Sequence, residues 1–243
     1  HRGLRHGRFA RGPGLTRGTI LRKAKPILHI HLLGSFHLVY GEQALTGLSS
    51  ARLQSFLACL ILHRHAPQSR QQLAFLFWPN SAESQARVNL RSVLHRLRQA
   101  FPEADYFLHI DRNTVRWCSD SPFSLDVADF ESAVAQTEQA ERVGDVSLQQ
   151  AALEQAVALY QGDLLPDCYD DWVLPERERL RQKVLGALEQ LIALVESQRD
   201  YLPAIRYAQQ LLRYDPLHEA TYRNLMRLYA LIDNRVNALR VYH

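Results

Sequence analysis

The segment 81–100 constrains the fold of this chain most, because it carries two different faces at helical spacing. Asn80 or Ser81 can cap the start of a helix, and Pro102 follows its end. At about 100° per residue, one arc about 100° wide is apolar, and its members are Ala86, Leu90, Val93, Leu94, Leu97 and Phe101. A second arc holds no acidic residue and comprises Ser84, Arg87, Arg91, His95 and Arg98, with Val88 and Ser92 beside it. The spacing predicts a long helix with one buried face and one basic face.

Short strands and two further helices are predicted before this helix. Apolar runs separated by glycine-containing turns are typical of a small antiparallel meander. Ser69 with Gln72 forms a capping-box signature for a short helix that ends before Pro79. The predicted elements are strands over 27–33, 36–40 and 43–45 and helices over 51–63 and 70–78.

A β-hairpin is predicted after the long helix. Residues 106–110 and 114–118 alternate between apolar and polar around the charged tip at 111–113. A meander, three helices and a hairpin, with a tight turn before the third helix, is the layout of a winged helix-turn-helix. The alternative is that the basic face of 81–100 is only a solvated helix surface.

In a winged helix-turn-helix the third helix enters the major groove of DNA. Arg87 and Arg91 could donate two hydrogen bonds to guanine or clamp phosphates, whereas Arg98 and His95 would meet backbone oxygens. Arg112 at the hairpin tip could reach a phosphate or a minor groove. The DNA-binding residues predicted in this way are Ser84, Arg87, Val88, Arg91, Ser92, His95, Arg98, Arg112 and Asn113.

Charge divides the chain into three blocks. Residues 1–26 carry +8 with no acidic residue, residues 27–119 carry +4, and residues 120–243 carry −8. The first block has few apolar residues and predicts a flexible basic arm, which either touches a polyanion or is a solvated tail. The basic front favours a polyanionic partner, whereas the acidic back would repel DNA and favours contacts with protein.

The second half predicts a polar linker at 120–125 and then a series of helices. Residues 167–171 predict a solvated acidic loop. A shift of 34 residues aligns parts of the last helices, and this period is typical of tetratricopeptide repeats. The alternative is a plain helical bundle. The helices are expected over 127–141, 147–160, 176–197, 201–213, 218–230 and 235–242.

Catalytic, cofactor and metal sites are not expected. The sequence holds no Gly-rich phosphate loop and no HExxH or Gly-x-Ser-x-Gly motif. Its three cysteines lack metal-ligand spacing, and the His29/His31 pair lacks further ligands. The sequence contains no run of 18 uncharged apolar residues, so no membrane span is predicted. We therefore expect a non-enzymatic cytoplasmic protein.

Several short motifs occur along the chain in a specific order. In the first half they are 32–36 (LLGSF), 73–79 (LAFLFWP), 89–91 (NLR) and 97–98 (LR). In the second half they are 158–165 (ALYQGDLL), 171–172 (DW), 176–180 (ERERL) and 215–219 (DPLHE). Together these motifs resemble those of the SARP-type (AfsR-like) bacterial transcriptional activators. The similarity covers residues 27–243 and pairs an OmpR-like winged helix with a bacterial transcriptional activator domain.

The resemblance implies a sequence-specific transcription activator that binds direct repeats in promoters and contacts RNA polymerase. It implies that residues 84–100 form the recognition helix and 111–113 the wing tip. Members often bind DNA cooperatively, so a homodimer on DNA is one arrangement that the resemblance leaves open. Some members continue into an ATPase, which fits an expected truncation at the C-terminal end.

The expected fold is mainly α with a small β component, a winged helix-turn-helix followed by an all-α tetratricopeptide-like repeat domain. We expect a basic arm at 1–26, a DNA-binding domain at 27–119 and a transcriptional activator domain at 120–243. The alternative function is a protein-interaction adaptor whose winged domain no longer binds DNA.

Overall fold

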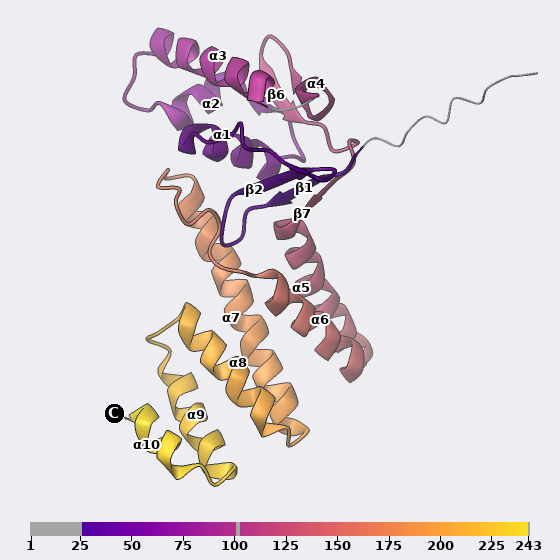
Figure 1. The fold of residues 1–243 in the computed structure, drawn as a ribbon, viewed down its shortest axis with the longest axis vertical. Helices are drawn as coiled ribbons and strands as arrows, with labels where there is room; N and C mark the ends of the chain where they lie inside the picture. The colour runs from indigo at the N-terminus through magenta and orange to yellow at the C-terminus, as the bar shows by residue number, and fades with distance from the viewer. Residues whose placement is uncertain (1–25, 101–102, 243) are drawn as a thin grey trace, which may run out of the picture.

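The computed structural model describes residues 26–100 and 103–242, in two units joined end to end (Figure 1). A small α/β unit lies at the top of the figure, and a series of helices runs from it to the opposite end. The fold is mainly α with a small β component, as predicted. Residues 1–25 of the basic arm expected at 1–26 lie outside the described residues, and so does Phe101.

A four-stranded sheet begins the α/β unit and has the order β3-β2-β1-β7. The predicted meander is confirmed by β1 (Leu28–His31), β2 (His37–Tyr40) and β3 (Gln43–Ala44), in which neighbouring strands are antiparallel. The fourth strand, β7 (Phe123–Leu125), pairs with β1 in parallel. The expectation of a polar linker at 120–125 was therefore wrong, because its last three residues complete this sheet.

Three helices follow the meander. They are α1 (Ala51–Leu62), α2 (Arg70–Phe77) and α3 (Glu83–Ala100). The hydroxyl of Ser69 accepts from the backbone N–H of Gln72, so the predicted cap of α2 is present. Residues 81 and 82 precede α3 rather than belonging to it, a correction of two residues at a helix end of the kind that helix termini commonly require. The described residues of the predicted apolar arc of α3 are all buried, namely Ala86, Leu90, Val93, Leu94 and Leu97.

The predicted hairpin is confirmed by β5 (Leu108–Ile110) and β6 (Thr114–Trp117). Before it, residues expected in the first strand form a short helix, α4 (Ala104–Phe107), so the strand begins two residues later than predicted. A two-residue strand, β4 (Gln68–Ser69), pairs antiparallel with β6 and gives a second sheet of order β4-β6-β5. These elements make up a winged helix-turn-helix.

Six helices lie within residues 126–242, the described part of the second unit, and each contacts the next along the chain. Their bounds confirm the predicted series to within a few residues; α7 begins three residues earlier than expected, with Pro175 in its first turn, where proline is tolerated. They are α5 (Asp126–Val143), α6 (Val146–Leu159), α7 (Val173–Ser197), α8 (Tyr201–Tyr214), α9 (Glu219–Leu231) and α10 (Arg235–Tyr242).

The period of 34 residues is visible in the backbone of this unit. Helices α8 and α10 begin at residues 201 and 235. Arg199 and Asp233, also 34 apart, both adopt the left-handed conformation that ends a helix, with φ of 61° and 56°. The residue after each of them donates its backbone N–H to the carbonyl of the residue five positions earlier. Asp200 donates to Val195, and Asn234 donates to Tyr229. The same turn therefore ends α7 and α9, as a helical repeat requires.

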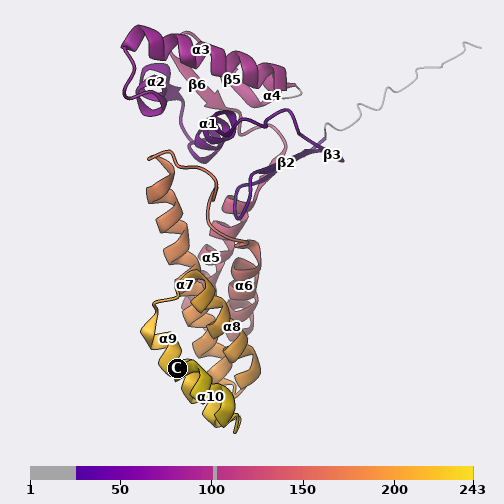
Figure 2. The same ribbon diagram turned by 60° about the vertical axis from the view of Figure 1, so that its left-hand side comes forward.

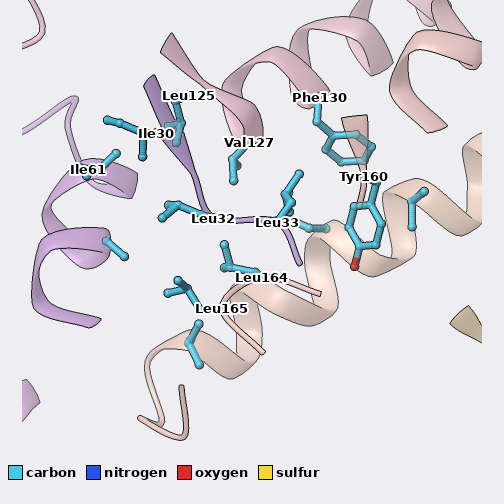
Figure 3. Close-up of a cluster of buried hydrophobic side chains, with 14 of the residues drawn as sticks. Ile30, Leu32, Leu33, Ile61, Leu125, Val127, Phe130, Tyr160, Leu164 and Leu165 are labelled. Atoms are coloured by element: carbon cyan, nitrogen blue, oxygen red, sulfur yellow. The ribbon is translucent and has the colours of Figure 1, made fainter. Parts of the chain in front are cut away.

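The two units share one hydrophobic core. After β1, Leu33 forms a β-bridge with Leu164, and the N–H of Leu165 donates to the carbonyl of Leu32. Figure 3 shows these leucines packed between side chains of both units, including Ile61 of α1 and Phe130 of α5. The segment that follows α6 thus pairs with the backbone of the residues that follow β1.

Asp126, the first residue of α5, closes this junction. Its Oδ2 accepts from the backbone N–H groups of Leu32 and Leu33 at 2.8 and 2.9 Å, and its Oδ1 accepts from Val127 at 2.7 Å. Burial raises the pKa of the carboxyl, and the three N–H donors oppose that rise. A buried carboxylate from the second unit therefore satisfies backbone donors of the first.

Candidate nucleic-acid interface

The exposed face of α3 lies at the end of the molecule that is farthest from the helical unit. Figures 1 and 2 both place α3 at the top, with α1 and α2 beneath it and α5–α10 lower still. The buried face of α3 packs on α2 and α1. The acidic second half therefore does not cover the basic face, and a long partner can approach it from outside.

All of the residues predicted on the outer side of α3 are exposed. They are Ser84, Arg87, Val88, Arg91, Ser92, His95 and Arg98. Val88 has 52% of its surface exposed although it is apolar. Arg96, by contrast, is exposed on the same helix but lies about 140° round the axis from Arg91.

Two of these arginines have carboxylate partners that the predicted acid-free arc did not include. The carboxylate of Glu83, one helical turn before Arg87, accepts from the guanidinium of Arg87 at 2.5 Å. The carboxylate of Asp105 in α4 accepts from the guanidinium of Arg98 at 3.1 Å. Among the described residues, the ion pairs on α3 involve only these two arginines. Both pairs are largely solvent-exposed, so each contributes at most about 1 kcal/mol and can be exchanged for another anion. Arg91, in the middle of the face, is left available to a ligand.

The wing tip is held in shape by Asp111. Its carboxylate accepts from the backbone N–H groups of Asn113 and Thr114 and from the Thr114 hydroxyl, each at 2.7 Å. The Thr114 hydroxyl, followed by the two backbone donors, lowers the pKa of Asp111 to about 2. The Asp111 carboxylate is thus occupied by donors of the wing itself, and the side chains of Arg112 and Asn113 beside it are exposed.

The start of α2 anchors this tip beside α3. The backbone N–H of Arg70 donates to the carbonyl of Asn113 at 2.8 Å, and its guanidinium donates to the carbonyl of Asp111 at 3.0 Å. Between these parts lies a hollow of about 640 Å³. It is lined by Ser69, Arg70, Gln71, Arg87, Leu90, Arg91, Arg112 and Asn113. Four arginines from α2, α3 and the wing therefore converge on one surface, and the lining includes no carboxylate.

The hollow contains four of the nine predicted residues, namely Arg87, Arg91, Arg112 and Asn113. The other five lie outside its lining, along the exposed side of α3, with Arg98 near the C-terminal end of that helix. Sequence reasoning missed Arg70 and Gln71. The only signal for them was their place at the first turn of a capped helix, because the β4–β6 pairing that brings this turn to the wing spans more than 40 residues.

The histidines considered as metal ligands lie near the start of the chain, on and beside β1 and β2. His29 contacts the hydroxyl of Ser124 at 2.8 Å, and His31 lies beside His37 with ring centroids 6.1 Å apart. Within 26–100 and 103–242, no group of three or more His, Cys, Asp or Glu side chains is placed to hold a metal ion. Over the same part of the chain, every helix is too short or too polar to cross a bilayer.

Fold and site together define a class of protein, a winged helix-turn-helix with an exposed basic helix followed by a helical-repeat unit. A family model, the bacterial transcriptional activator domain, matches residues 125–243. Regulatory protein AfsR of Streptomyces coelicolor is 25% identical over 202 residues, which are 83% of this chain and 20% of AfsR. The chain thus spans about a fifth of that relative.

A solved structure of Mycobacterium tuberculosis EmbR, in complex with a low affinity phosphopeptide, matches with a TM-score of 0.71. The match covers 90% of this chain and 58% of that chain at 20% identity, and it supports the fold. Residues 125–243 thus form a bacterial transcriptional activator domain, and the chain as a whole is similar to AfsR-like transcriptional activators of the SARP type.

Proposed function

We propose that this chain binds double-stranded promoter DNA through α3 and the wing and activates transcription by contacting RNA polymerase through α5–α10. The observation that carries the proposal is the arginine-lined hollow between α2, α3 and the wing. An α-helix is about 10–12 Å wide with its side chains, which fits a major groove about 12 Å wide. Helix α3, with 18 residues, is about 27 Å long and can follow that groove.

Each residue has a role that follows from its position. Arg91, central and without an ion pair among the described residues, donates to a guanine edge. Val88 presents an apolar surface that can contact a thymine methyl group. Arg87 exchanges Glu83 for a base or phosphate, because the ion pair is exposed and weak.

The other contacts fix the register on the duplex. Arg98, His95, Ser84 and Ser92 meet backbone oxygens along α3. At the opposite edge, Arg112 and Asn113 of the wing, with Arg70 and Gln71 of α2, hold the phosphates of one strand.

The acidic second unit serves protein contacts in this proposal. Residues 120–243 carry −8. Helices α5–α10 extend away from α3 (Figure 1). A negatively charged surface is repelled by DNA, so the α5–α10 unit remains free for RNA polymerase while α3 is bound. Binding to direct repeats would place a second copy beside the first as a homodimer on DNA. The protein would act in the cytoplasm, where the promoter DNA is, and we propose no catalytic activity for it.

The test begins with selection of bound duplexes from a random pool, using the full chain. A recovered motif repeated about one helical turn apart would support side-by-side copies on one face of the DNA. Fluorescence anisotropy then compares this motif with an arbitrary duplex across salt concentrations. We expect steeply salt-dependent binding to both, because phosphate contacts release counterions.

Arg91→Ala should lose about 1–3 kcal/mol of binding to the selected motif and much less on the arbitrary duplex. Arg96→Ala is the matched control, because it removes the same charge from the same helix on the side away from the hollow. Equal losses on both duplexes would reassign Arg91 to phosphate anchoring. An absence of salt-sensitive binding would favour the adaptor, in which the winged unit no longer binds DNA.

A further inference from the structure

The loop that leads into α7 docks on α1 of the winged unit. Asp170 accepts from the Ser55 hydroxyl at 2.5 Å and from the Arg52 guanidinium at 3.0 Å. Trp172 donates its indole N–H to the same Ser55 hydroxyl at 3.0 Å. The expectation that 167–171 forms only a solvated acidic loop was wrong for Asp170, whose side chain is 27% exposed. One carboxylate of the helical unit is therefore committed to the winged unit.

The contact continues from α1 to the C-terminal end of α2. The guanidinium of Arg52 lies 3.4 Å from the carbonyl of Phe77 and over the rings of Phe77 and Trp78, at 5.8 and 6.0 Å from their centroids. The Phe77 ring also lies 6.4 Å from that of Trp172. Arg52 is thus held between a carboxylate of the second unit and the residues that end α2.

This arrangement supplies a charge that α2 lacks. The last carbonyls of a helix have no partner within it, and a cation near them is favourable. The last turn of α2 contains no basic residue. Arg52 provides the cation from α1, and Asp170 sets the direction of its guanidinium. Trp78, where α2 ends, is five residues before the start of α3, and its carbonyl accepts from Ser81 in the connecting turn.

We infer that Asp170 is a positioning residue for DNA recognition: acting through Arg52, it fixes the end of α2 and the turn into α3, so that the helical unit sets the DNA affinity of the winged unit. The inference rests on the proposed DNA binding by α3. It assigns the docked loop a second role beyond holding the two units together, because through Arg52 and the Phe77 ring the loop reaches the end of α2 that leads into the basic helix.

Two measurements separate positioning from a purely structural role. The Arg52–Asp170 pair is partly exposed, with side chains 41% and 27% accessible, so its loss should leave the protein folded. A structural role alone would lower the unfolding midpoint and leave the affinity of the folded protein unchanged. A positioning role weakens DNA binding of the folded protein and accelerates amide hydrogen exchange in the turn at residues 78–82.

The experiment uses the full chain and the duplex recovered by selection, at a temperature where circular dichroism shows every variant folded. Asp170→Asn keeps the shape of the side chain and removes its charge. Asp171→Asn is the control, because it makes the same charge change in the same loop on an exposed side chain. Arg52→Lys keeps the positive charge and loses the planar guanidinium.

We expect Asp170→Asn to weaken binding to the selected duplex about five- to twentyfold, and Arg52→Lys to weaken it to a similar extent. The double variant should be no weaker than either single variant, because both changes break one pathway. Amide exchange in 78–82 should rise in these variants without DNA, and Asp171→Asn should leave exchange and affinity unchanged or bind slightly more tightly.

If Asp170→Asn matches Asp171→Asn in affinity and in amide exchange, the inference is overturned while the proposed function stands. If the unchanged chain binds no duplex, the proposed function fails and this inference fails with it. If exchange in 78–82 rises but affinity does not change, the turn is loosened without consequence for DNA and the inference is again overturned.

Discussion

Replacing Asp126 with alanine tests what joins the winged unit to the helical unit. The substitution removes the acceptor for the backbone N–H groups of Leu32 and Leu33, both of which are buried. It also removes the acceptor for Val127 in the first turn of α5. The Cβ atom remains, so the change deletes hydrogen bonds while creating little apolar cavity.

The magnitude follows from the donors left without a partner. Each buried N–H that loses its acceptor costs about 1–3 kcal/mol, which gives about 2–6 kcal/mol for Leu32 and Leu33. Part of this is offset, because the variant no longer keeps a carboxyl group in a site where burial raises its pKa. We expect a net loss of about 3 kcal/mol in the free energy of unfolding for Asp126→Ala. Asp126→Asn should lose about 1 kcal/mol, because its amide oxygen can still accept from both leucine N–H groups.

Urea unfolding followed by circular dichroism and tryptophan fluorescence measures these differences. The matched control is Asp129→Ala, which removes the same charge from the same first turn of α5 at an exposed position. That control should cost less than about 1 kcal/mol, the size of a helix-dipole effect. An Asp126→Ala variant as stable as Asp129→Ala would refute the reasoning that this carboxylate holds the junction.

Two further predictions concern single turns. The pKa of Asp111 is lowered to about 2, chiefly by the Thr114 hydroxyl. The ionised carboxylate therefore orders the wing fully at pH values above the ordinary carboxyl pKa, and this ordering is lost as the pH falls through about 2. A titration of the Asp111 carboxyl carbon by NMR should show this midpoint, and Thr114→Val should raise it toward about 4; an unchanged midpoint would contradict the assignment. Gly34→Ala should destabilise the protein by about 2 kcal/mol, because φ is +81° and the new Cβ would lie 3.0 Å from the carbonyl oxygen of Gln161. The control is Gly144→Ala, because Gly144 has a φ of +72° but open space around its Cβ position, and this variant should lose about 1 kcal/mol in the free energy of unfolding. Thermal unfolding compares the two variants, and equal losses would contradict a steric contribution at Gly34.

Much of the fold could be predicted from local patterns. The apolar arc of α3 and the capped start of α2 follow from residues close in sequence, and a long amphipathic segment has few other solutions. Strand β7 could not be predicted in the same way. It is three residues long, and its partner β1 lies about 95 residues earlier, so no local periodicity marks it. The short helix α4 was missed because aromatic residues such as Tyr106 and Phe107 are enriched in strands, whereas here they lie in a single helical turn.

The candidate site also combines features that local sequence predicts with features that depend on long-range contacts. Exposure along α3 follows from helical geometry, and the structure brings Arg87 and Arg91 to the same hollow as Arg112, although their contact with DNA stays a prediction. The contribution of Arg70 depends on the pairing of β4 with β6, which is a long-range event. Asp170 looked like part of a solvated loop because nothing near it in sequence shows that Ser55 and Arg52 face it. Sequence patterns reveal faces, whereas they do not reveal which faces meet.

The parallel pairing of β7 with β1 has a practical consequence for dissecting this protein. A fragment cut after residue 119 would contain helices α1–α4 and the hairpin, but the backbone of Leu28–Ile30 would lose its neighbour on one side. Unpaired strand edges pair with strands of other chains, so such a fragment is expected to associate with itself. Its behaviour would then not represent that of the isolated winged unit. A shortened version that keeps this side of β1 and the residues after it paired should instead retain the chain at least through Leu165, which among the described residues is the last to donate a backbone hydrogen bond there.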